Sequence, residues 1–140
     1  TGIAPFRAFL QQRDINGDQG RNWLFFGDRT ESGEYYYKEE MDDWKERGVI
    51  DKHDLAWSRD GAEKVYVQHL MKKHGEEIWN WLDNGGYFYV CGDKSRMAKD
   101  VHKTLIGICA EYGGMSEGEA KSYVEDGMMK SEKRYLRDVY

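Results

Sequence analysis

Short apolar runs alternate with amphipathic segments along the sequence, and this alternation restricts the possible folds more than any other feature. The runs are too short for helices and are bounded by turn residues, so each predicts a strand. The four predicted strands are NWLFFG, DKHDLAWS, YFYVCG and RYLRDVY. The predicted helices are the segment that opens TGIAPFRAFLQQR, 34–47, 65–86 as one broken or two successive helices, 95–114 and 116–131. Strands that alternate with helices predict an α/β fold with a parallel sheet flanked by helices.

Two of the predicted helices carry a clear apolar pattern. Tyr37, Met41 and Trp44 stand four and three residues apart among charged residues, as on one face of an amphipathic helix. The helix predicted over 95–114 has Ser95 in the position of a capping residue and Gly113 as its natural end.

The bulk properties set limits on the classes of protein and partner. At 140 residues the chain is about one domain, residues 1–140. A net charge of −5 gives no support for nucleic-acid binding. There is no leader-like segment and no apolar run near the roughly 18 residues of a membrane span, and only two cysteines, so a cytoplasmic location without membrane contact is expected. The four histidines show no metal-binding spacing with the cysteines, so no metal site is expected.

Polar residues follow three of the predicted strands. Parallel sheets bind ligands beyond the carboxyl ends of their strands, so GDRT at 27–30, SRD at 58–60 and CGDKSRM at 91–97 are expected along one rim. Thr1 and Gly2 precede the first helix, whose unpaired backbone N–H groups suit a pyrophosphate. The simpler alternative is that Gly2 and Pro5 only start a helix, and the sequence contains no GxGxxG fingerprint.

The segment after the second strand offers groups that can hold a phosphate. Ser58 and Arg59 supply a hydroxyl and a planar set of donors, which suit a phosphate monoester better than a bare ribose diol. Lys64, Tyr66 and Gln68 alternate, so in an extended segment they would point the same way. The alternative interpretation of this segment is a solvated charged turn.

Two residues near the later strands have open interpretations from position alone. Cys91 closes an apolar strand, where packing in the core is a simpler explanation than chemistry. Tyr140 is an aromatic residue at the end of the sequence, and such a residue is unusual there unless it stacks on something.

Six segments, in this order and spacing, resemble the ferredoxin-NADP reductase-like NADPH-binding module of the diflavin reductases: TGIAPFRAFLQQR, AWSRD, KVYVQ, YVCGD, MAKDV and RDVY. The resemblance covers nearly the whole chain and is greatest to the sulfite reductase flavoproteins. It implies an NADPH-dependent reductase that passes hydride to FAD and then electrons through FMN to a haem-containing sulfite reductase subunit. The same module of a cytochrome P450 reductase-like enzyme, or an NADP-binding module without activity, remains as an alternative. A nucleotide-binding domain of unrelated purpose, such as a methyltransferase, would show no preference for the 2′-phosphate.

The resemblance also implies roles for individual residues. Those at the 2′-phosphate and adenosine end are Ser58, Arg59, Lys64, Tyr66 and Gln68. Thr1 and Arg29 would contact the pyrophosphate, and Cys91 and Asp138 would lie near the nicotinamide as candidate catalytic residues. Tyr140 would stack on the flavin ring. Asp93 and Met97 would support the cofactor site, although each could equally be a helix cap or a packing residue.

The sequence departs from the family pattern at its start. The first strand of the family module and its GPG turn would lie before Thr1, so the central strand of the expected sheet is predicted upstream of this sequence. The FAD- and FMN-binding domains are likewise expected outside it, in the same polypeptide.

Overall fold

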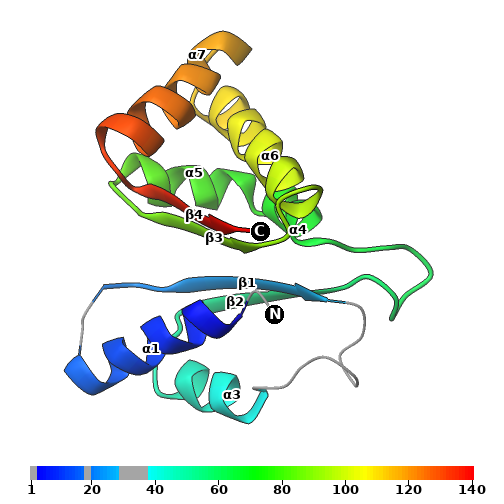
Figure 1. Cartoon of the computed structure of the whole chain (residues 1–140), viewed down its shortest axis with the longest axis vertical. Helices are drawn as coiled ribbons and strands as arrows, with labels where there is room; N and C mark the ends of the chain where they lie inside the picture. The colour runs from blue at the N-terminus through cyan, green and yellow to red at the C-terminus, as the bar shows by residue number, and fades with distance from the viewer. Residues whose placement is uncertain (1–2, 18–19, 29–37) are drawn as a thin grey trace. The chain divides into compact units, whose positions relative to one another are not determined.

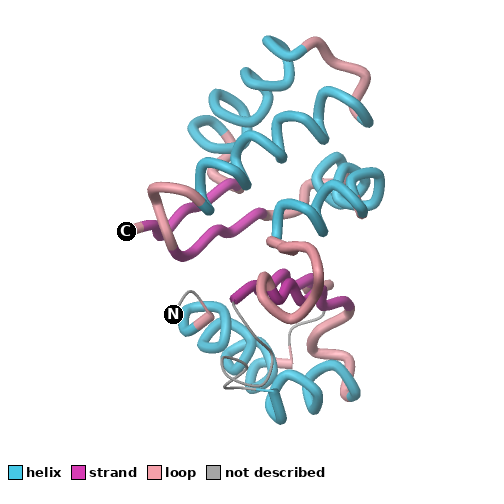
Figure 2. The backbone as a smooth tube through the Cα atoms, turned by 90° about the vertical axis from the view of Figure 1, so that its right-hand side faces the viewer, coloured by secondary structure: helices cyan, strands magenta, loops and turns pink. Residues whose placement is uncertain are grey.

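The computed structural model describes residues 3–17, 20–28 and 38–140, and these fall into two compact units (Figures 1 and 2). The N-terminal unit is Thr1–Leu70 and the C-terminal unit is Met71–Tyr140. A single domain over residues 1–140 stays a prediction.

The N-terminal unit contains a pair of parallel strands with helices on one face. Its elements are α1 (Ala4–Asn16), β1 (Trp23–Asp28), α3 (Lys38–Glu46) and β2 (Lys52–Trp57). In Figure 1, α1 and α3 lie on the same side of β1 and β2. The strands pair in parallel from Trp23 beside Lys52 to Asp28 beside Trp57. The parallel pairing predicted from strand and helix alternation is confirmed here.

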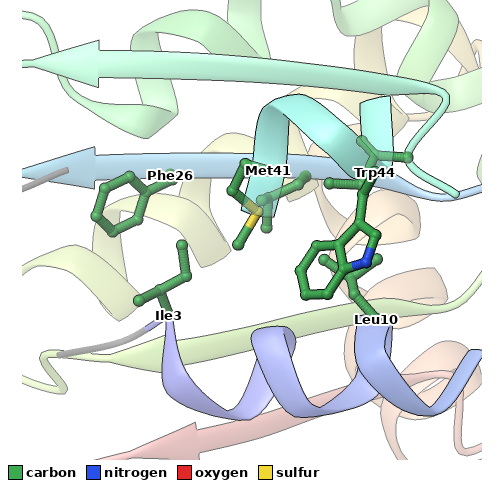
Figure 3. Close-up of a cluster of buried hydrophobic side chains, with 7 residues drawn as sticks. Ile3, Leu10, Phe26, Met41 and Trp44 are labelled. Carbon is green, nitrogen blue, oxygen red and sulfur yellow. The ribbon is translucent and has the colours of Figure 1, made fainter. Parts of the chain in front are cut away.

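The core of this unit forms where α1 and α3 cover the strands. The buried cluster comprises Ile3, Leu10, Leu24, Phe26, Met41, Trp44 and Ile50, and Figure 3 shows it between the elements. Leu24 and Phe26 alternate with less buried neighbours along β1, so they share the face that the helices cover. Met41 and Trp44 confirm the predicted apolar face of α3, whereas Tyr37 lies outside the described residues.

Two ion pairs at the edge of this core join α1 to α3 and to the residue that directly follows α3. The guanidinium of Arg7 lies 2.8 Å from the carboxylate of Glu40, and that of Arg47 lies 2.8 Å from Asp14. Both pairs are partly exposed, and such pairs contribute little to stability, about 1 kcal/mol at most. Apolar burial therefore holds the unit together, and the ion pairs orient its two helices.

The C-terminal unit repeats this arrangement with a second parallel pair of strands. Its elements are α4 (Val67–Lys73, shared with the end of the N-terminal unit), α5 (Gly75–Asp83), β3 (Phe88–Gly92), α6 (Met97–Tyr112), α7 (Glu117–Ser122), the π-helix η1 (Tyr123–Ser131) and β4 (Tyr135–Val139). In Figure 1, α5, α6 and η1 lie on one side of β3 and β4. Within this unit α6 packs on β3, and η1 packs on β4. The segment 65–86 forms two successive helices.

The described strands form two two-stranded parallel sheets, β1 with β2 and β3 with β4. This separation agrees with the prediction that the central strand of the expected sheet lies upstream of these residues. The segment 116–131 is an α-helix followed by a π-helix, because the amide of Glu132 donates to the carbonyl of Gly127, five residues back, at 2.7 Å. Among the described helices, none has the length and apolar character needed to cross a membrane.

Candidate functional site

The carboxyl ends of β1 and β2 meet at one edge of the N-terminal sheet. The amide of Ser58, the first residue after β2, donates to the carbonyl of Asp28, the last residue of β1, at 2.9 Å. The side-by-side placement predicted for GDRT and SRD is thus confirmed at Asp28 and Ser58. Arg29 and Thr1, the predicted pyrophosphate contacts, lie outside the described residues.

We call residues 58–68 the phosphate segment. Ser58 is half-buried at the end of β2, whereas Arg59 and Lys64 are exposed. Within 3–17, 20–28 and 38–140, neither of these two cations forms an ion pair with the protein. Their charges are therefore available to an anion from outside, and the nearby Ser58 hydroxyl can donate to the same anion. This donor set fits a phosphate monoester.

The predicted alternation of Lys64, Tyr66 and Gln68 is wrong at Gln68. Lys64 and Tyr66 precede any regular element, but α4 begins at Val67, so Gln68 lies in the first turn of a helix. The carbonyl of Tyr66 accepts from the amide of His69 at 3.0 Å, and its own amide donates to His69 Nδ1 at 2.9 Å. These bonds start the helix at Val67, so the extended segment ends before Gln68. A cofactor contact of Gln68 stays a prediction, no longer supported by alternation.

The second group of predicted residues lies at the carboxyl ends of β3 and β4. We call Cys91, Asp138 and Tyr140 the C-terminal site. Cys91 of β3 stands beside Asp138 of β4 in the parallel register. The amide of Tyr140 donates to the carbonyl of Gly92 at 3.1 Å, and the amide of Lys94 donates to the carbonyl of Tyr140 at 3.0 Å. The ring of Tyr140 is 67% exposed, so it can stack on a planar group.

The environment of Cys91 keeps its thiol protonated. Cys91 is half-buried, and burial together with the negative charge of Asp138 raises the pKa of the thiol. A reactive nucleophilic cysteine has the opposite environment, which lowers its pKa. Cys91 is therefore suited to contact a ligand as a neutral thiol. Cys109 is fully buried in α6, and burial raises its pKa to about 11, as expected of a structural residue.

Asp93 caps the start of α6, and the predicted capping role of Ser95 is wrong. The Asp93 carboxylate accepts from the amides of Ser95, Arg96 and Met97 at 3.2, 2.9 and 3.2 Å, and from the Ser95 hydroxyl at 2.8 Å. A carboxylate accepts more of the unpaired amides at a helix start than one hydroxyl can. These bonds lower the pKa of Asp93 to about 2. Of the two interpretations for Asp93, the structure shows the cap, and contact with a cofactor stays a prediction.

Glycine is required at the last residue of β3, directly before this cap. Gly92 has φ 132°, a backbone conformation that other residues rarely adopt, and a Cβ there would lie 2.9 Å from the terminal methyl of Met97. Met97 is half-buried at the first position of α6. The structure therefore gives Met97 a packing position against the strand end, and its support of a cofactor stays a prediction.

Replacing Asp93 with alanine is expected to lower the unfolding temperature in a pH-dependent way. The pKa of Asp93 falls from 3.8 to about 2 on folding, so its charge stabilises the folded state fully above about pH 4. This contribution is lost progressively as the pH falls from about 4 to about 2, and below that the carboxyl group is protonated in both states. Thermal unfolding followed by circular dichroism at pH 6 and pH 3 should show a smaller wild-type to variant difference at pH 3. A difference that does not change with pH would contradict the cap.

Two side-chain clusters at the start of β4 were not predicted. Buried Arg134 donates hydrogen bonds to Tyr123, Glu132 and two backbone carbonyls. Next to it, the Tyr135 hydroxyl lies 3.0 Å from Nδ1 of His102, whose Nε2 lies 3.0 Å from Glu125. Burial raises the pKa of Tyr135 to about 12, so its hydroxyl keeps its proton for this contact. For Arg134 the sequence shows only a cation directly before a strand. Such a residue is usually exposed, so the pattern gave no sign of burial.

Parallel strands alternating with helices, with a hydroxyl and two exposed cations after a strand, are typical of nucleotide-binding α/β proteins. The family model described as the oxidoreductase NAD-binding domain matches residues 1–103, and the chain belongs to this family. The fold class predicted from the sequence is confirmed by this match and by the parallel strand pairs.

Three relatives of the chain share one name. It is 50% identical over all 140 residues to the sulfite reductase [NADPH] flavoprotein alpha-component of Vibrio cholerae serotype O1, and covers 22% of that protein. It is 47% identical over its full length to the proteins of the same name from Pectobacterium atrosepticum and Klebsiella pneumoniae, and covers 23% of each. The predicted resemblance is confirmed, and the chain spans less than a quarter of the length of these curated relatives.

Proposed function

We propose that this chain is the NADPH-binding part of a diflavin reductase of the sulfite reductase type. The observation that carries the proposal is the identity of about 50% over all 140 residues to a sulfite reductase [NADPH] flavoprotein alpha-component. In this proposal FAD- and FMN-binding domains belong to the same polypeptide, a haem-containing subunit accepts the electrons, and the complex works in the cytoplasm.

The phosphate segment supports the choice of NADPH over NADH. Arg59 and Lys64 are exposed cations, and Ser58 adds a hydroxyl at the end of β2. An enzyme that selects NADH more usually presents a carboxylate to the free 2′-hydroxyl. In the proposed complex these three residues hold the 2′-phosphate, and the exposed ring of Tyr66 covers the adenine.

The C-terminal site supports the hydride-transfer end of the proposal. NADPH supplies a hydride to FAD, and its nicotinamide ring becomes positively charged as the hydride leaves. The carboxylate of Asp138 offers a negative charge near that ring, and the neutral thiol of Cys91 beside it offers packing and a weak hydrogen bond. The exposed ring of Tyr140 stacks on the flavin until the nicotinamide takes its place.

The proposal is tested on the full-length protein that carries this chain. NADPH is added to the purified flavoprotein under anaerobic conditions, and the flavin absorbance near 450 nm is followed in a stopped-flow instrument. We expect the flavin to be reduced by NADPH within about a second, since enzymes commonly turn over at about 10 per second. NADH at the same concentration should act far more slowly. If the flavoprotein binds NADP⁺ but its flavin is not reduced by NADPH, the proposal is wrong and the chain is better described as an NADP-binding module without activity.

A further inference from the structure

Arg134, directly before β4, is a buried charge with an unusually complete set of partners. Its side chain is 10% exposed. The guanidinium donates to the carbonyls of Leu82 and Gly86 at 2.9 and 3.0 Å, to the Tyr123 hydroxyl at 3.0 Å and to the Glu132 carboxylate at 3.1 Å. A buried guanidinium is unfavourable unless its donors are satisfied. These bonds are therefore the reason that the charge can be buried here.

The partners of Arg134 come from separate parts of the C-terminal unit. Leu82 belongs to the last turn of α5, Gly86 precedes β3, and Tyr123 begins η1. The backbone of Arg134 adds two further bonds, because its carbonyl accepts from the amide of Phe88 at 2.7 Å and its amide donates to Met128 at 2.9 Å. Arg134 thus fixes the first residue of β4 against the first residue of β3 and against η1.

The rest of β4 has little side-chain packing to define its register. Leu136, Arg137 and Asp138 are all exposed, whereas Tyr135 is 1% exposed. Register is weakly specified along a strand whose side chains are not buried, and a shift of one residue moves every side chain to the opposite face. A shift by one residue would therefore remove Asp138 from its place beside Cys91. The contacts at the start of β4 must supply the specificity that its later residues lack.

We propose that Arg134 is a positioning residue, which sets the register of β4 against β3 and so holds Asp138 beside Cys91. Its importance for catalysis rests on the proposed function, in which this pair lies at the hydride-transfer end. The register itself can be measured without NADPH, because the thiol of Cys91 senses both its burial and the charge of Asp138.

The test follows alkylation of Cys91 by iodoacetamide in the full-length protein between pH 7 and 10, with mass spectrometry of the peptide that contains Cys91. Arg134→Met has a similar length but no donors, so β4 should lose its register. The pKa of Cys91 should then fall toward that of the Asp138→Asn variant, because the negative charge that raises it has moved away, and alkylation at pH 8 should be about threefold faster than in the wild type. Arg134→Lys keeps the charge but cannot reach all four acceptors, so a smaller shift in the same direction is expected.

Two controls separate positioning from a general loss of stability. Ile78→Ala removes a buried side chain of α5, so it should destabilise the same unit but leave the alkylation profile of Cys91 unchanged. An equal shift in Ile78→Ala would overturn the proposal, and so would a wild-type profile in folded Arg134→Met. If Arg134→Met does not fold, Arg134→Lys is used instead, and a wild-type alkylation profile in folded Arg134→Lys would also overturn the proposal. Hydride transfer that is insensitive to both Cys91→Ser and Asp138→Asn would count against the proposed function alone, since the thiol measurement needs no cofactor.

Discussion

Replacing Arg59 with alanine is expected to weaken the binding of NADP⁺ to the full-length protein by about tenfold to a hundredfold, with little effect on NAD⁺. A hydrogen bond to a charged group contributes roughly 1.5–3 kcal/mol, and each 1.4 kcal/mol corresponds to a factor of ten in affinity. NAD⁺ lacks the 2′-phosphate and so loses nothing when the guanidinium is removed. Isothermal titration calorimetry with the two oxidised dinucleotides measures both affinities without turnover.

The control for this experiment is another exposed cation. Lys121 lies on α7, outside both groups of candidate residues, and Lys121→Ala changes the net charge by the same amount. It should leave both affinities nearly unchanged, because Lys121 belongs to neither group of residues that the proposal places at the cofactor. Equal losses for NADP⁺ and NAD⁺ in Arg59→Ala would show that Arg59 does not contact the 2′-phosphate, and the phosphate segment would then be a solvated turn.

The order of helices and strands could be predicted because it depends on local patterns. The apolar run at β1 and the spacing of Met41 and Trp44 in α3 determine which surface each element buries, and both appear in the structure as expected. The pairing of Cys91 with Asp138 confirms that β3 and β4 run parallel with their carboxyl ends together. Such predictions succeed because hydrophobic burial imposes the same period on sequence and structure.

Local hydrogen bonds decided the details that the sequence did not reveal. Ser95 and Asp93 are both good capping residues, and only the path of the chain after Gly92 shows that the Asp93 carboxylate reaches the helix amides. The start of α4 depends in the same way on the bond between Tyr66 and His69. A difference of one or two residues in a helix boundary is small for the fold, but it decides which side chains share a face.

Contacts between residues distant in the sequence were not predictable from patterns at all. Arg134 finds its acceptors 48 and 52 residues away, at Gly86 and Leu82, and nothing in the segment KRYLRDV indicates them. The π-helix is similar: the buried residues Ala120, Val124 and Met128, four apart, predict a helix but do not reveal hydrogen bonds between residues five apart. Both features concern how β4 is held, so the part of the C-terminal site that depends on β4 is also the part that sequence reasoning described least well.

The C-terminal site predicts a kinetic effect that differs from the effect at the phosphate segment. Cys91→Ser and Asp138→Asn should each lower the rate of flavin reduction at saturating NADPH by about tenfold to a hundredfold, while the affinity for NADP⁺ stays nearly constant. A group that acts mainly in the transition state lowers the rate without weakening binding. Loss of a buried electrostatic partner costs about a hundredfold to a thousandfold, and we expect less here because Asp138 is exposed and Cys91 only half-buried.

The two substitutions also test whether the pair acts together. Cys91 and Asp138 are neighbours across the strands, so their effects should not be independent, and the double variant should be less impaired than the product of the single effects predicts. Single-turnover reduction in a stopped-flow instrument gives the three rates directly. A rate that is unchanged in Cys91→Ser would identify Cys91 as a packing residue. The electrostatic contribution would then rest on Asp138 alone.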